Sequence, residues 1–269
     1  MELTGTKRLA GNMGAFYGET CNAIQNSINL FTEQLNKVTN QKMLAVKPRA
    51  IIAPHAGWVY SGFTANAAYK TLANANPGRI VVIGPSHHVY FEGVSAAFTQ
   101  FYETPCGSLQ TDLPFLEKLN QKFRFKSVTD AHFSEHSTET QMPFIKHYFP
   151  HTKIIEFVYG KTTWQQVAEI VEYILSDEQS ALVISSDLSH FYPLHEAELL
   201  DAVCLNAIKH ADLNLFDQGC EACGIIGIKA LINTVNKLQL KTGIIDYRTS
   251  ADASNDESRT VGYAAAAVW

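Results

Sequence analysis

Histidine and aspartate side chains follow three short apolar segments of the chain, at the point where each segment ends. His55 follows the first segment, in the sequence RAIIAPHAG. His87 follows the second, in RIVVIGPSHH, and Asp187 and His190 follow the third, in ALVISSDLSH. Because ligands of open α/β sheets bind outside the carboxyl ends of the strands, these side chains are expected to converge in one crevice. Neutral imidazole is the commonest metal ligand in proteins, so the pattern predicts a metal site there.

The second segment ends in two adjacent histidines, His87 and His88. Successive side chains of an extended segment point in opposite directions, so only one of the two is expected to face the crevice. The other is expected to pack or to form a hydrogen bond. A single histidine after a strand is more often a hydrogen-bonded loop residue, and the convergence of three strand ends is what favours the metal site.

A cysteine is the candidate third ligand. Cys223 directly precedes Gly224, where a helix is predicted to begin, and the positive end of a helix favours thiolate over thiol. Cys223 is therefore expected to have a lowered pKa and to act as a soft ligand, the alternative being a buried thiol. Cys220 and Cys223 form a C-x-x-C pair, but the absence of a second such pair argues against a zinc ribbon. Cys204 is expected to be a buried thiol on the apolar face of a helix.

Composition limits the partners and the compartment. Five cysteines are spread through a chain whose first residues include no apolar signal segment, which favours free thiols in a reducing compartment, by default the cytoplasm. No apolar stretch approaches the roughly 20 residues that a membrane span needs. With 21 Lys+Arg, 26 Asp+Glu and no long basic run, the net charge of −5 argues against nucleic acid as a partner. The oligomeric state is left open.

The remaining polar segments are expected to be structural. The segment 133–145, FSEHSTETQMPFI, is predicted to be a solvated polar turn that contains Glu135, His136 and Glu139, with Ser137 capping a short helix. Further histidines are predicted to lie on the surface: His132, His147, His151, His195 and His210. No phosphate-binding glycine loop or nucleophile-elbow motif is present, which argues against a nucleotide cofactor and against triad hydrolysis.

The elements that must position these residues alternate between short apolar runs and amphipathic stretches. This alternation is typical of strands buried on both faces of a sheet that helices cover on each side, and one domain over 1–269 is expected. Ser61 is the expected N-cap of its helix, and 99–108 is expected to be a plain loop. Strands are predicted at 49–54, 79–85, 152–160, 181–187, 241–250 and 259–268, and helices at 21–39, 61–74, 162–176, 195–210 and 224–238.

Several segments resemble the MEMO family, the B component of the AmmeMemoRadiSam gene neighbourhood. The matching segments are IIAPHAGWVYSG, VIGPSHHV, TPCGSLQTD, EHSTETQMPF, SSDLSH, CGIIGI and VGYAA, whereas the family's N-terminal pattern is kept only loosely. The resemblance implies the fold of class III extradiol dioxygenases, a three-layer α/β/α sandwich with a mixed central sheet. It also implies a metal pocket formed by His55, His87 and Cys223, with Asp187 and His190 beside it as candidate catalytic residues.

Three functions remain open at this point. The leading hypothesis is a metal-binding redox enzyme that uses one ion of iron, copper or zinc and acts on a small molecule or a partner. A second is extradiol ring cleavage, with His190 in acid–base catalysis and Asp187 completing or orienting the site. A third is a non-catalytic module that binds a peptide, since family members studied in animals resemble signalling adaptors. The fold alone does not imply dioxygenase activity.

Overall fold

The structure, a computed structural model, describes residues 5–37 and 41–269 of the chain. Its strands are β1 (Gly5–Arg8), β2 (Ala50–Ala53), β3 (Arg79–Pro85), β4 (Val94–Ala96), β5 (Thr99–Tyr102), β6 (Leu109–Gln110), β7 (Lys153–Tyr159), β8 (Ser180–Ser185), β9 (His190–Tyr192), β10 (Thr242–Thr249) and β11 (Thr260–Val268). Its helices are α1 (Cys21–Leu35), α2 (Gln41–Leu44), α3 (Trp58–Leu72), α4 (Leu113–Phe123), α5 (Thr129–Phe133), α6 (His136–Glu139), α7 (Met142–Tyr148), α8 (Trp164–Leu175), α9 (Leu194–His210), the 3₁₀ helix η1 (Leu215–Gln218), α10 (Ile225–Leu238) and α11 (Ala251–Ser254).

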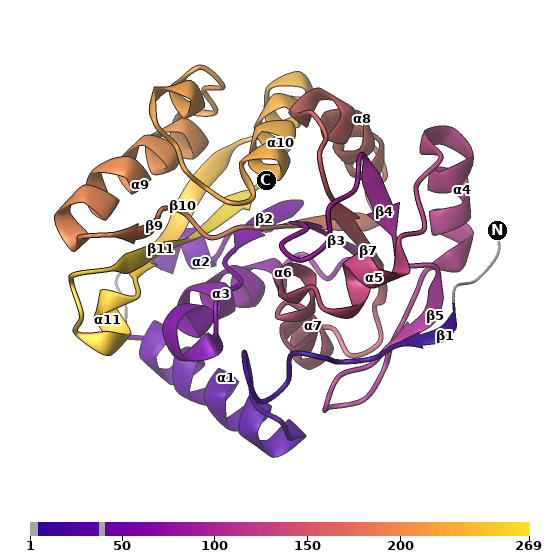
Figure 1. Cartoon of the computed structure of the whole chain (residues 1–269), viewed down its shortest axis with the longest axis horizontal. Helices are drawn as coiled ribbons and strands as arrows, with labels where there is room; N and C mark the ends of the chain where they lie inside the picture. Colours follow the sequence, from indigo (N-terminus) through magenta and orange to yellow (C-terminus); the bar gives the residue numbers. More distant parts are fainter. Residues whose placement is uncertain (1–4, 38–40) are drawn as a thin grey trace.

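The central sheet is mixed, as predicted. Its strand order is β10-β11-β2-β8-β3-β7-β4, and β9 pairs with one end of β11. The inner strands β2, β8, β3 and β7 run parallel, whereas β10, β11 and β4 pair antiparallel with their neighbours. Figure 1 places α8, α9 and α10 on one side of the sheet and α1, α3 and α7 on the other.

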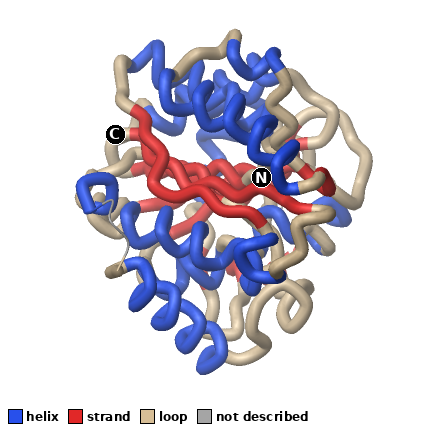
Figure 2. Tube along the Cα trace, turned by 90° about the vertical axis from the view of Figure 1, so that its left-hand side faces the viewer, coloured by secondary structure: helices blue, strands red, loops and turns tan. Residues whose placement is uncertain are grey.

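Two hydrophobic cores hold the layers together. The strand β2 illustrates the arrangement, because Ala50 and Ile52 belong to one core and Ile51 and Ala53 to the other. Apolar residues of α4, α8, α9 and α10 complete the first core, and those of α1, α3 and α7 complete the second. Figure 2 shows the sheet between two helical layers. The predicted three-layer α/β/α sandwich is therefore confirmed.

Three local predictions need correction. The helix α3 begins at Trp58 after Gly57, not at Ser61, whose hydroxyl instead donates to the carbonyl of Ala56 within the first turn. The segment 99–108 is not a plain loop, because β5 pairs in parallel with β1 at its start. The first predicted helix, 21–39, ends at Leu35, and its last positions, 38–39, lie outside the described residues.

The cysteines also differ from expectation. Cys21 forms a disulfide with Cys106, and Cys204 forms one with Cys220, which leaves Cys223 as the free thiol. Folding brings the partners of each pair to Cα separations of 4.6 and 4.9 Å, within the range that a disulfide spans. Cys204 is buried as predicted, but not as a thiol. The argument for a reducing compartment therefore loses its basis. Among the described residues, no helix is both long and apolar enough to cross a membrane.

Candidate metal centre

Neighbouring parallel strands deliver the predicted residues to one edge of the sheet. Ala53 at the end of β2 lies opposite Ser185 at the end of β8, and β8 pairs in turn with β3. His55, Asp187 and His87 each follow their strand by two residues. The rings of His55 and His87 lie 5.1 Å apart, centroid to centroid, so the predicted convergence of strand ends is present in the structure.

His55 is fully buried, and its hydrogen bonds determine which ring nitrogen is free. Its Nδ1 lies 2.9 Å from the hydroxyl of Ser185, which donates its single proton to the carbonyl of Ser137 at 2.5 Å. Ser185 must therefore accept a hydrogen bond from the N–H at Nδ1 of His55, as it does from Gln141 Nε2. The Nε2 atom of His55 is left with its lone pair available. The backbone N–H of His55 donates to Asp187 Oδ1 at 2.7 Å, which fixes the loop.

His87 is oriented by a buried carboxylate. Glu135 accepts from the His87 backbone at 2.6 Å and from its Nδ1 at 2.8 Å. Burial acts to raise the pKa of Glu135, but the hydrogen bonds from His87 and Ser137 outweigh it and lower the pKa to about 2. The ionised carboxylate thus holds the proton on Nδ1 and leaves Nε2 free, the arrangement in which carboxylates commonly support histidine ligands of metals.

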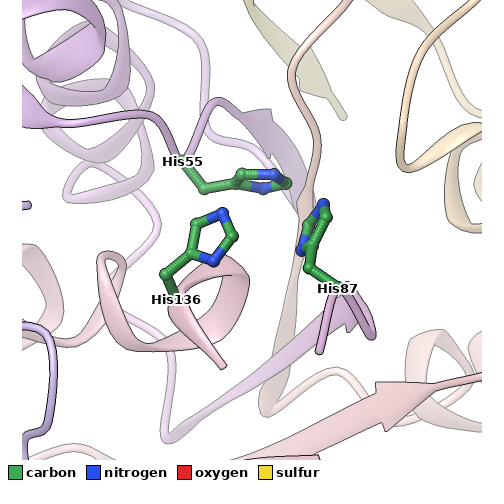
Figure 3. A group of neighbouring side chains, drawn as sticks. All are labelled: His55, His87 and His136. Atoms are coloured by element: carbon green, nitrogen blue, oxygen red, sulfur yellow. The ribbon is translucent and has the colours of Figure 1, made fainter. Parts of the chain in front are cut away.

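A third histidine, His136, completes the group. Its ring lies 4.5 Å from that of His87 and 5.4 Å from that of His55, and Figure 3 shows the three rings gathered together. One ligand atom from each of the three lies within 4.8 Å of the others. Burial lowers the pKa of His136 to about 4, helped by His55 and His87, and burial likewise lowers that of His55. Both rings are therefore neutral at pH 7, the form that binds metal.

His136 belongs to the segment that the sequence predicted to be a solvated turn, and that prediction is wrong. Glu135 and Glu139 are both buried, and Glu139 forms a buried ion pair with Arg8 at 2.8 Å. Glu135, not Ser137, caps α6 by accepting from a backbone N–H. Within the local sequence, burial was indicated only by the spacing of the acidic residues beside the apolar segment 142–145. Arg8, the ion-pair partner of Glu139, lies far away in the sequence.

His132 also departs from the predicted surface position. It is 4% exposed, and its Nδ1 lies 3.2 Å from a carboxylate oxygen of the fully buried Glu156. Its Nε2 contacts the hydroxyl of Ser95 at 2.9 Å. His132 therefore belongs to the interior rather than to the surface.

His88, the other member of the adjacent pair, contacts His136, with the two ring centroids 5.5 Å apart. It is exposed, and its Nε2 lies 3.4 Å from Nδ1 of His136. Within the candidate group, His87 is therefore the member of the pair that lies beside His55.

Cys223 and Asp187 flank the free nitrogen of His55. The Cys223 sulfur lies 3.3 Å from His55 Nε2, and Asp187 Oδ2 lies 4.0 Å from the same atom. The pKa of Cys223 is raised to about 12 by burial and by the charge of Asp187, contrary to the predicted lowering. The start of α10 does not offset these effects, so the metal-free protein holds a thiol. Burial also raises the pKa of Asp187.

A cleft of about 410 Å³ opens beside these residues. His136, Asp187 and His190 line it together with Arg259 and Tyr263. The structure therefore brings all five predicted site residues into one region, with His190 at the cleft. The roles assigned to them stay predictions.

The N-terminal segment closes one side of the cleft. Phe16, which also lines the cleft, stacks on the ring of His136 at 4.6 Å. Tyr17 donates from its hydroxyl to Glu139 at 2.9 Å, and the backbone N–H groups of Gly11 and Asn12 donate to the same carboxylate. The segment is thus attached to α6 by hydrogen bonds to the buried Glu139, although its sequence matches the family only loosely.

Fold and site together define a class of α/β/α sandwich proteins with a candidate histidine metal centre at the carboxyl edge of parallel strands. The chain belongs to the Memo-like protein family, whose model matches residues 8–267. A MEMO1 family protein of Aquifex aeolicus is 30% identical over 247 residues, covering 86% of this chain and 91% of the relative. MEMO1 family proteins of Archaeoglobus fulgidus and Methanosarcina mazei are 31% and 28% identical, covering 80% and 94% of this chain and 84% and 95% of the relatives.

Proposed function

We propose that this chain is a metal-dependent redox enzyme that binds one iron or copper ion at His55, His87 and His136 and acts on a small molecule in the adjacent cleft. The observation that carries the proposal is the grouping of three imidazoles with ligand atoms within 4.8 Å of one another. Two of them lie beside hydrogen-bond acceptors that hold the proton on Nδ1. Imidazole ligands suit iron, copper and zinc, of which the first two transfer electrons.

Cys223 is proposed as a further ligand. Its sulfur lies 3.3 Å from His55 Nε2, close to the roughly 3.5 Å expected between a sulfur and a nitrogen bound tetrahedrally to one ion. Metal binding requires the thiol to release its proton, so metal affinity is expected to rise with pH. Replacing Cys223 by serine should abolish the thiolate charge-transfer absorption of the copper-loaded protein, whereas its persistence would remove Cys223 from the ligand set.

The cleft provides the groups that handle the small molecule. A bound ion would supply electron transfer and polarisation of that molecule. His190 is the candidate residue for moving a proton at the substrate, and Asp187 holds the backbone of His55 in place. Arg259 contributes a positive charge to the same cleft.

Ring cleavage is the second candidate, and the placement of His190 favours it. Ring cleavage needs an acid–base histidine beside the ion, and His190 lines the same cleft as His136 without belonging to the three-histidine group. Oxygen uptake that depends on catechols as substrates would favour ring cleavage over a more general redox activity.

The test pairs metal content with oxygen consumption in the presence of catechols and reductants. His87→Ala should lose the ion and the activity together. His190→Ala should keep the ion and lose about 10²–10⁴-fold in rate, as expected for a missing acid–base group. The exposed His151→Ala is the control and should change neither. Equal metal content in wild type and His87→Ala would contradict the proposal, and peptide binding without metal would favour an adaptor.

A further inference from the structure

A second group of metal-ligating side chains lies next to the first. His88, Glu135 and His136 each offer one ligand atom within 4.8 Å of the other two. His88 Nε2 is 3.4 Å from His136 Nδ1, and Glu135 Oε1 is 3.5 Å from the same nitrogen. His88 is exposed, as is His87 in the first group, so solvent reaches both groups.

These separations fit two ligands on one ion better than two hydrogen-bonded groups. Hydrogen bonds donated by nitrogen are about 2.7–3.2 Å long between heavy atoms. Both contacts are longer than this range. A tetrahedral ion with ligand bonds of about 2.0–2.1 Å places neighbouring ligand atoms about 3.3–3.4 Å apart. The separation of 3.4 Å between His88 Nε2 and His136 Nδ1 thus matches the edge of a tetrahedron around an ion.

Glu135 keeps an acceptor position for such an ion. A carboxylate offers about four lone-pair positions. Glu135 uses three of them, for the backbone and ring of His87 and for the backbone of Ser137. The position that remains is on Oε2, because Oε1 already accepts from the ring of His87 and from the backbone of Ser137. The carboxylate also supplies the negative charge that a divalent cation needs.

We propose that His88, Glu135 and His136 bind a second divalent transition-metal ion, such as Zn²⁺, adjacent to the first. His136 would bind it through Nδ1 and keep Nε2 for the first ion. With both nitrogens coordinated, the ring loses its N–H proton to solvent as the second ion binds. Because His88 is exposed, water can complete the coordination.

The test is a Zn²⁺ titration of the metal-free chain in competition with a chelator, which counts the ions bound. Wild type is expected to bind two ions, and His88→Ala one. His151→Ala, which removes another exposed histidine, should still bind two. His88→Gln repeats the test with a bulkier polar side chain, and far-ultraviolet circular dichroism confirms that each variant is folded.

His55→Ala separates this inference from the proposed function. The second site is supported if His88→Ala loses an ion that His55→Ala retains. Any other pattern overturns it, including equal numbers of ions in wild type and His88→Ala. A wild-type chain with a single ion that depends on His88 and not on His55 would support the second site and contradict the proposed function.

Discussion

Hydrogen bonds behind the imidazole rings determine which nitrogens of His55 and His87 are free. Ser185 accepts a hydrogen bond from Nδ1 of His55, and Glu135 accepts one from Nδ1 of His87. Both acceptors are buried, so water does not compete for these hydrogen bonds. The two Nε2 atoms are thus oriented before a metal arrives, which lowers the cost of ordering them on binding.

Glu135→Gln tests this orientation directly. The amide keeps the size of the side chain but removes the charge that holds the proton on His87 Nδ1. The affinity for the ion should fall by about 10–100-fold, the usual effect of losing a carboxylate behind a histidine ligand. Chelator competition measures the affinity in a His88→Ala background, which lacks a ligand of the proposed second ion, with the exposed Glu92→Gln as control. An unchanged affinity in Glu135→Gln would show that His87 needs no such partner.

The neutral histidines make the metal-free protein sensitive to acid. The pKa of His136 is lowered to about 4, below its ordinary value of 6.5, so as pH falls the unfolded chain takes up a proton first. Stability should therefore fall between pH 6.5 and about 4, with His55 acting in the same direction. His136→Asn should bind about one proton fewer on unfolding and show a smaller loss of Tm from pH 7 to pH 5. An equal loss in wild type and variant would contradict this explanation.

At the scale of single residues, the sequence predicts some members of the site and not others. His55, His87 and Asp187 could be predicted because each follows an apolar strand by two residues. His136 could not, because α6 is buried by contacts with distant parts of the chain, such as the Arg8–Glu139 ion pair, whose partners are 131 residues apart. Local polarity predicts exposure, whereas distant partners made burial favourable here.

At the scale of elements, the turn before α10 positions Cys223. Gly224 is its N-cap, and its N–H donates to the hydroxyl of Ser186 at 2.9 Å. A Cβ atom at position 224 would lie 2.5 Å from the Cβ of Ser186 and 2.7 Å from the carbonyl oxygen of Ser185. The turn can thus approach the end of β8 this closely only with glycine at that position.

Gly224→Ala should therefore destabilise the protein and displace Cys223. Forcing extra atoms into a packed site costs about 1–3 kcal/mol, which lowers Tm by roughly 2–10 °C in a chain of this size. Gly5→Ala is the control, since a Cβ there would meet nothing within 4 Å. Thermal unfolding measures both, and a Tm of Gly224→Ala equal to wild type would show that the turn can move aside.

The pairing of β1 with β5 shows why this region was predicted to be a loop. The strand β5 covers four residues, and its parallel partner β1 lies more than 90 residues earlier in the chain. Such a short segment has too few residues for alternation of apolar and polar side chains to be recognised. The longer strands β3, β7 and β8, which are buried along most of their length, could be predicted because they read as continuous apolar runs.

At the scale of the whole molecule, two disulfides join parts of the chain that lie apart in sequence. Cys21 at the start of α1 is joined to Cys106, 85 residues away, and Cys204 on α9 is joined to Cys220, 16 residues away. Sequence alone favoured free thiols, because cysteine number and spacing do not reveal which residues the fold brings together.

Counting thiols tests this pairing. Protein purified without reductant and unfolded in denaturant should expose one reactive thiol per chain, that of Cys223, out of five cysteines. Added reductant should raise the count to five. Peptide mapping by mass spectrometry identifies the pairs, and five thiols before reduction would contradict the pairing.

The central claim is that His55, His87 and His136 surround one metal ion at the carboxyl edge of the parallel strands. Its most direct test is an anomalous difference map from crystals of the iron- or copper-loaded protein, recorded at the absorption edge of the metal. The account predicts a peak about 2.0–2.3 Å from Nε2 of His55 and of His87. A loaded protein whose anomalous peaks all lie away from these two nitrogens would contradict it.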